Sequence, residues 1–369
     1  MNNSYFILSD KTIEIEKFHI CTWESLNGPS YIEIGAEIKK DSFNDAMKKQ
    51  NDGETDITLY LAIPYCSTIK KVSDLSYKFT NNDNNARFIF NDEVEGHTNL
   101  DADNKNGVIL KFKEKKELTI LPCAPTIKDE NNKDGNNIDG LLTIKLKEIP
   151  NLPADQETGN YYFRILIETD GIIAEKNNNG LNKTNYIYDL KINKTRNLPD
   201  CIFRLKKDKR LNFCDINQLF CFHVVPDTFE LSFVHSKALQ SVRILESDAF
   251  SNYLKKEVSQ AGTGHNNIIF LKDNTSKKDG YSFFTVCTDE SFGIKQVAWA
   301  VLANIFVSIL FASASFRTRT DLDEKSSWIS QLPTEYWVAI GTIIVILIFL
   351  IWGKRIRSCL RHFISWIKK

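Results

Sequence analysis

The segment LLTIKLK, residues 141–147, alternates between apolar and polar side chains along most of its length. Leu142, Ile144 and Leu146 fall on one side of an extended chain, and polar residues occupy the positions between them. Because successive side chains of a β-strand point to opposite faces of a sheet, this pattern predicts a strand with one buried face.

Segments of the same kind recur along the chain up to about residue 290, with Asn-rich turns between them. They include SYIEIGAEI (30–38), DITLYLAI (56–63), RFIF (87–90), VILKFK (108–113), YYFRILIE (161–168), YIYDLKI (186–192), CIFRL (201–205), TFELSFV (228–234) and YSFFTVC (281–287). Only DSFNDAMKKQ (41–50) and SDAFSNYLKKEVSQ (247–260) have the pattern of short helices.

Many short strands without crossover helices predict a domain made of packed layers of sheet. We therefore expect a mainly β region built as an antiparallel sandwich or barrel, in one or two units. Pro150 and Pro153 interrupt the strand pattern. The expected division places one β-rich unit at residues 1–150 and a second at residues 151–295.

The charge distribution disfavours nucleic acid as a direct partner. The whole chain has a formal net charge of +0, and residues 1–296 carry about five more acidic than basic residues. Phosphate contacts need clustered Lys and Arg. One basic run, RLKKDKR (204–210), is interpreted as a solvated turn or strand end.

Signatures of catalysis and cofactor binding are missing from the sequence. It contains no glycine-rich phosphate loop, no elbow serine and no zinc-binding H-E-x-x-H. Cys221 and His223 are the best candidates for a metal, but zinc needs four converging ligands and their apolar surroundings favour packing. We expect no enzymatic activity, no cofactor and no metal, and we expect the eight scattered cysteines to be reduced.

The two longest apolar runs of the chain lie beyond residue 296. Residues 297–316 run without a charge for about the 20 residues that a helix needs to cross a bilayer, and residues 336–352 are shorter but more apolar. The charged segment between them is short enough for a loop. The sequence therefore predicts a transmembrane helical hairpin over residues 296–352.

Residues around the second run predict how this hairpin is oriented. Residues 353–369 form a basic amphipathic tail with six Lys and Arg and no acidic residue. Positive flanks stay in the cytoplasm and aromatic rings prefer the headgroup level, so we expect a multi-pass protein of the inner membrane with both the N-terminal domain and the tail cytoplasmic. The expected interface residues are Tyr336, Trp337, Trp352, Lys354, Arg355, Arg357, Arg361 and Trp366.

Small and polar residues form a stripe along the first run. Ala300, Asn304, Ser308, Ala312 and Ser315 recur at intervals of three or four residues, so they lie on one face of a helix. Small residues permit close packing, and Asn or Ser can hydrogen-bond between helices. The stripe is either a contact between the two helices of one chain or a surface where several copies line an opening.

A β-rich domain followed by two C-terminal spans resembles, in domain order, the two-helix membrane effectors of bacterial antiphage (abortive-infection) systems. The resemblance implies a separate sensor, such as a nucleotide-signal synthase that makes a nucleotide second messenger or a short Argonaute. The hypothesis that follows is that this trigger makes the two-helix segment, as part of a homo-oligomer, depolarise the inner membrane. Two alternatives stay open: a passive membrane anchor for a scaffold that recruits another protein, and a membrane-bound enzyme.

Overall fold

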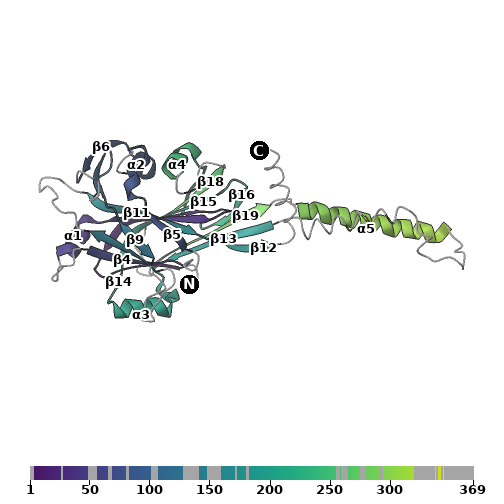
Figure 1. The fold of residues 1–369 in the computed structure, drawn as a ribbon, viewed down its shortest axis with the longest axis horizontal. Coiled ribbons are helices and arrows are strands. Elements are labelled where there is room, and N and C mark those ends of the chain that lie inside the picture. Colours follow the sequence, from purple (N-terminus) through teal and green to yellow (C-terminus); the bar gives the residue numbers. More distant parts are fainter. Residues whose placement is uncertain are drawn as a thin grey trace, which may run out of the picture. The chain divides into compact units, whose positions relative to one another are not determined.

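The computed structural model describes most of the chain up to residue 319. The described residues are 4–25, 28–48, 56–64, 69–79, 83–100, 107–127, 141–147, 159–170, 173–179, 183–254, 258, 265–274, 280–290, 294–319, 337, 340–341 and 344. Within them the chain is mainly β, as the alternating segments predict, and its strands form two sheets (Figure 1).

The first sheet, sheet I, has nine described strands. Seven follow one another across it: β16 (Phe229–Val234), β19 (Tyr281–Glu290), β13 (Lys183–Ile192), β1 (Ser4–Ser9), β4 (Asp56–Ala62), β10 (Leu141–Lys147) and β9 (Ala124–Ile127). Two short strands add to it, with β12 (Glu175–Asn179) beside β13 and β14 (Asn212–Phe213) beside β1.

The second sheet, sheet II, has ten described strands. Its order is β17 (Leu239–Ile244), β18 (Asn266–Asp273), β15 (Asp215–Pro226), β2 (Glu14–Trp23), β3 (Ser30–Ile38), β11 (Asn160–Thr169), β8 (Leu118–Ile120), β7 (Val108–Phe112) and β6 (Val94–Asn99). Strand β5 (Ile69–Asp74) pairs with β11 at Ile165–Thr169, and β8 pairs with residues 160–162 of the same strand.

Both sheets are mixed, so the expectation of purely antiparallel sheets was wrong. β1 runs parallel to β13, β2 runs parallel to β15, and β8 runs parallel to β11. Alternation in one segment predicts which face is buried but carries no information on the direction of a partner that lies far along the chain.

The two sheets pack face to face around the main hydrophobic core. Ile7 and Leu59 of sheet I and Ile20 and Ile34 of sheet II belong to the same buried cluster. Each sheet also has a covered outer face, because helices α2 (Asp83–Phe90) and α4 (Ser247–Leu254) lie over sheet II and α3 (Asp200–Asp208) lies over sheet I (Figure 1). The β-rich part is therefore a sandwich-like arrangement with helices on both outer faces.

Two segments expected as strands are helices. RFIF (87–90) ends α2, where Asn85 donates to the Lys78 carbonyl at 3.0 Å and the Phe90 ring lies 4.9 Å from that of Tyr162. CIFRL (201–205) lies in α3, which follows the extended Pro199 and buries Ile202 and Leu205. Apolar runs of four or five residues do not distinguish helix from strand by periodicity alone.

The two expected short helices are confirmed: α1 spans Lys40–Lys48 and α4 spans Ser247–Leu254. Two short 3-10 turns that were not expected occupy Ser76–Phe79 (η2) and Thr195–Asn197 (η3). By its contacts the chain divides into two compact units, one of residues 1–177 and 185–289 and the other of residues 178–184 and 290–369. The expected boundary near residue 150 falls inside the first unit, and both sheets take strands from either side of it.

Helix α5 (Ile294–Arg319) is the longest helix of the described part, with 26 residues. It contains the first expected membrane run, and the side chains described in it are those of residues 297–313. Among the described residues, no helix combines the length and the hydropathy required of a membrane span. The second expected run lies almost entirely outside the described residues.

Candidate functional site

The outer face of sheet II carries an unusual row of polar side chains. On β3, Ile32, Ile34 and Ala36 belong to the core between the sheets, so Glu33 and Glu37 point to the opposite face. The register of β3 with its neighbours places Arg164 of β11 and His19 of β2 opposite Gly35. Alternation therefore brings polar and charged groups of three strands together beneath α2 and α4.

The centre of this row is an ion pair between Glu33 and Arg164. The Arg164 Nη2 atom lies 2.6 Å from the Glu33 Oε2 atom, and Arg164 Nε donates to the same oxygen at 2.8 Å. The Trp23 Nε1 atom donates to Glu33 Oε1 at 2.6 Å, and the Tyr253 hydroxyl of α4 donates to Oε2 at 3.2 Å. The side chains of Glu33 and Arg164 are 0% and 8% exposed.

Electrostatics keep the Arg164 guanidinium charged despite its burial. Burial is the largest influence and disfavours the charge, but Glu33, Tyr253 and Tyr162 together outweigh it and raise the pKa of Arg164 well above its usual value. Burial also raises the pKa of the Tyr253 hydroxyl. Because Glu33 accepts three hydrogen bonds and forms the ion pair with Arg164 Nη2, neither of its oxygens is free to act as a general base.

Next to the pair, His19 and Tyr162 continue the polar row. Tyr162 Oη accepts from Arg164 Nη1 at 3.1 Å and lies 3.5 Å from the Nδ1 atom of His19. Burial, together with nearby Arg164 and other cations, lowers the pKa of His19 to about 3. The imidazole is therefore neutral at physiological pH.

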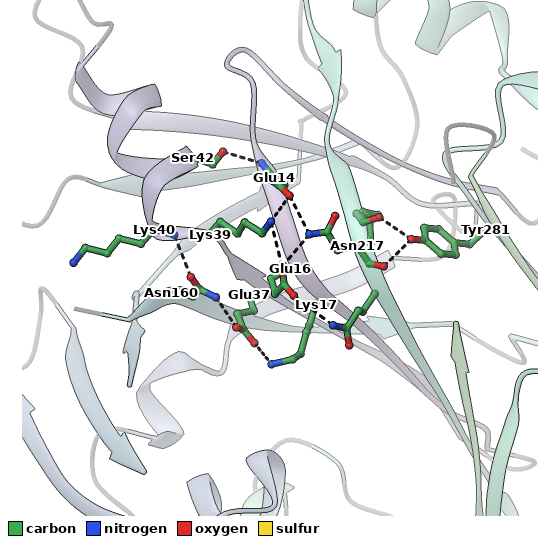
Figure 2. Close-up of polar contacts among 12 residues, drawn as sticks. Glu14, Glu16, Lys17, Glu37, Lys39, Lys40, Ser42, Asn160, Asn217 and Tyr281 are labelled. Atoms are coloured by element: carbon green, nitrogen blue, oxygen red, sulfur yellow. Dashed lines mark hydrogen bonds and ion pairs between the residues drawn. The ribbon is translucent and has the colours of Figure 1, made fainter. Parts of the chain in front are cut away.

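At the open end of the row, Glu14 and Glu16 share partners from two other segments. Lys39 contacts both carboxylates, and Asn217 Nδ2 donates to Glu14 Oε1 at 3.0 Å and to Glu16 Oε2 at 2.9 Å (Figure 2). The backbone N–H of Glu14 donates to Ser42 Oγ at 2.9 Å. The hydrogen bond from Lys39 lowers the pKa of Glu14 more than any other contact.

A second group in the same view links β2, β3 and β11. Lys17 Nζ lies 2.7 Å from Glu37 Oε2, and Asn160 Nδ2 donates to Glu37 Oε1 at 2.7 Å (Figure 2). The side-chain carbonyl of Asn160 accepts from the backbone N–H of Lys40 at 3.2 Å. These contacts tie the start of α1 to the sheet.

Together these contacts position the strands and helices around sheet II. Each carboxylate of the row is hydrogen-bonded, and Tyr253 ties α4 to the strands that carry Glu33 and Arg164. Within the described part of the chain, no group of three His, Cys, Asp or Glu side chains is arranged to hold a metal. The row is suited to fixing the helices on sheet II.

The structure places Cys221 and His223, the candidate metal ligands, inside the sandwich. Cys221 Sγ lies 3.5 Å from His223 Nε2, and Thr22 Oγ1 lies 2.8 Å from His223 Nδ1. The Tyr188 ring stacks on the imidazole with 4.5 Å between centroids. Burial lowers the pKa of His223 to about 3. Both ring nitrogens already face protein groups.

The sequence contains a signal for the buried ion pair, which an analysis of apolar periodicity alone overlooks. Glu33 and Arg164 are charged residues of opposite sign inside SYIEIGAEI and YYFRILIE, whose other residues are mostly apolar. Charged residues are buried almost only when paired. Two opposite charges in two apolar strands are therefore a reason to expect strand pairing.

The structure describes four of the five residues of the predicted stripe on α5. Ala300, Asn304, Ser308 and Ala312 are all exposed, and the side chain of Ser315 lies outside the described residues. Ser308 Oγ donates to the Asn304 carbonyl of its own helix at 2.8 Å. A different line of side chains on the helix is half-buried: Ala298, Leu302, Ile305 and Ile309.

Large apolar side chains are exposed along α5. They are Val297, Trp299, Val301, Phe306, Val307, Leu310 and Phe311. At about 100° of rotation per residue these positions are spread around most of the helix circumference. A helix with apolar residues on all sides is normally buried, either in a large core or in a membrane.

Of the expected interface residues, Trp337 is described and is 53% exposed. The others lie outside the described residues: Tyr336, Trp352, Lys354, Arg355, Arg357, Arg361 and Trp366.

No model of a known protein family matches the chain, and no curated protein matches it.

Proposed function

We propose that the chain is a membrane-anchored effector, in which the β-rich part receives a trigger and the segment of residues 297–352 permeabilises or depolarises the inner membrane. The observation that carries the proposal is the exposure of large apolar side chains around α5, such as Trp299, Phe306 and Phe311. Exposing this apolar surface to water is unfavourable, whereas the hydrocarbon of a bilayer removes it from water.

The faces of α5 support an active role for the helix. The half-buried line through Leu302, Ile305 and Ile309 is separate from the exposed stripe through Asn304 and Ser308. The exposed stripe thus stays available to other copies, which could line a polar opening with Asn304. This arrangement favours assembly of several chains over packing of the stripe within one chain.

The β-rich part supplies a rigid receiver for the trigger. Its buried Glu33–Arg164 pair and the Tyr253 contact hold α4 on sheet II. By resemblance of domain order, the trigger is a nucleotide second messenger or a partner protein such as a short Argonaute. In this proposal the N-terminal domain and the basic tail are cytoplasmic, and the anionic inner leaflet is the lipid partner.

A second function, a passive anchor, is favoured by one contact. Because Ser308 Oγ donates to the Asn304 carbonyl, its hydroxyl proton is used within the helix and does not face a pore. In this case α5 and the second run only hold a β-rich scaffold at the membrane.

Membrane potential distinguishes the two functions. The full chain and its Asn304→Leu variant are overexpressed in bacterial cells that carry a potential-sensitive dye, so that concentration replaces the trigger, with Phe306→Leu as a control on the face of α5 opposite Asn304. The effector proposal expects depolarisation by the native chain and by Phe306→Leu, and its loss in Asn304→Leu. An unchanged potential at equal membrane levels of the native chain contradicts the effector and leaves the passive anchor.

A further inference from the structure

The last turn of α3 gathers positive charge on the outer face of sheet I. Residues 203–212, FRLKKDKRLN, contain five basic residues and one acidic residue. Ile202 and Leu205 pack against Phe6 and Leu8 of β1 in a small core of their own. That burial fixes the helix and turns its basic face outward.

Contacts with aromatic rings hold two of these cations in place. Lys206 Nζ lies 4.7 Å from the centroid of the Phe213 ring, and Lys209 Nζ lies 4.8 Å from that of Tyr60. Lys209 Nζ also donates to the Tyr60 hydroxyl at 3.2 Å. Arg210 adopts a left-handed backbone conformation with φ of 53°, which turns the chain at the end of the helix.

A hollow of about 370 Å³ opens between these residues. It is lined by Phe203, Lys206, Lys207, Arg210, Leu211 and Asn212. No carboxylate is among these lining residues, and the ion pairs of the described residues include none with the three lining cations. The hollow is therefore a shallow, open surface whose positive charge is not neutralised by an ion pair with any described residue.

The lining cations are not needed to satisfy the free carbonyl groups at the end of α3. Three carbonyls of the last turn already accept backbone N–H groups: Leu205 from Lys209 at 3.0 Å, Lys206 from Leu211 at 2.8 Å and Lys207 from Arg210 at 3.3 Å. The helix dipole presents about half a negative charge at this end, which is less than the three positive charges of the lining. A surplus of positive charge remains for an anion.

We propose that this hollow binds a phosphate-bearing small molecule. A guanidinium donates two parallel hydrogen bonds to phosphate oxygens, and ammonium groups add charge, so Arg210 with Lys206 and Lys207 matches a phosphate. Phe203, which is 58% exposed at the rim, offers an apolar face to the rest of the ligand. The shared chemistry is the phosphate, carried either by a nucleotide or by a lipid headgroup.

Calorimetric titration of the full chain in a nonionic detergent tests the proposal, with ADP and glycerol 3-phosphate as the two probes. Lys207→Gln and Arg210→Asn each remove a lining cation, and Asn tolerates the left-handed backbone at position 210. Arg204→Gln is the matched control, because Arg204 is an exposed cation of the same helix outside the lining. We expect binding to weaken about tenfold in each lining variant and by about twofold or less in the control, since exposed charges are screened by salt.

The two probes also separate the two sources of phosphate. Tighter binding of ADP than of glycerol 3-phosphate, with the difference lost in Phe203→Ala, supports a nucleotide. Equal binding of both probes supports a lipid headgroup. Absence of binding for both probes overturns the proposal, and so does an equal loss of affinity in Arg204→Gln and Lys207→Gln.

Discussion

Glu33 and Arg164 lie 131 residues apart in the sequence and form an ion pair with 2.6 Å between Oε2 and Nη2. Neither side chain is appreciably exposed, and two further donors from β2 and α4 complete the shell of Glu33. Removing one partner of such a pair leaves an uncompensated buried charge, which is far more costly than losing a surface pair.

Arg164→Leu is therefore expected to destabilise the β-rich part strongly. The loss in unfolding free energy is about 3–5 kcal/mol, because the carboxylate of Glu33 stays buried without its countercharge. Thermal unfolding followed by circular dichroism measures it. Lys113→Gln, which breaks the exposed pair between Lys113 and Glu93, is the control and should leave the transition unchanged. Equal midpoints for the native chain and Arg164→Leu would show that the pair carries little stability.

Gly35→Ala is expected to disturb the same face through crowding. A Cβ at position 35 would lie 2.4 Å from Tyr162 Oη and 3.0 Å from Cζ. Displacing the Tyr162 ring costs about 1–3 kcal/mol. In chemical denaturation, Gly35→Ala combined with Tyr162→Phe should lose less stability than the sum of the single changes, because Phe removes the closest clash. Gly96→Ala, where a Cβ meets nothing within 4 Å, serves as the control. Additive losses would contradict a direct clash.

The low pKa of His19 predicts a loss of stability in acid. The folded state holds the imidazole neutral down to a pKa of about 3, whereas the unfolded chain protonates it near pH 6.5. The stabilising difference is thus fully present above about pH 6.5 and is lost as the pH falls from there toward 3, by about 1.4 kcal/mol per pH unit. The unfolding free energy, measured by chemical denaturation at a series of pH values between 7 and 4, should fall less steeply with decreasing pH for His19→Gln than for the native chain. Identical slopes would mean that His19 is not held neutral by its surroundings.

Glu24 acts in the opposite direction on the pH scale. It accepts backbone N–H groups of Ile173 and Ala174, but burial dominates and raises its pKa. A carboxyl whose pKa is higher in the folded state contributes stability at low pH and loses it as the pH rises. Glu24 therefore offsets part of the loss of unfolding free energy in acid, and it does so equally in the native chain and in His19→Gln. The difference between these two proteins isolates the contribution of His19.

The strands were the most predictable part of the fold, and their partners the least. LLTIKLK and SYIEIGAEI are strands β10 and β3 as their alternation indicates. RFIF and CIFRL were predicted wrongly because packing decides between helix and strand in so short a run: Phe90 joins an aromatic cluster with Phe79 and Tyr162. The parallel pairing of β2 with β15 depends on contacts across about 200 residues, which no local pattern encodes.

The candidate sites also differ in how far the sequence predicts them. Helical spacing predicts that Asn304 and Ser308 share a face, and both lie in α5. The hollow beside α3 was hidden, because RLKKDKR was interpreted as a solvated turn and only the burial of Ile202 and Leu205 turns its cations to one side. Charge clustering is visible in the sequence, whereas the convergence of these cations on one shallow hollow requires the fold.

Protease treatment of inverted inner-membrane vesicles, washed at alkaline pH, tests the central claim of a cytoplasmic β-rich part anchored by residues 297–352. We expect the full chain to pellet with the washed vesicles. Protease should then digest residues 1–295 from the outer side of the vesicles and leave a protected fragment of the anchor. Recovery of the chain in the alkaline supernatant, or protection of the β-rich part from protease until detergent is added, would contradict the claim.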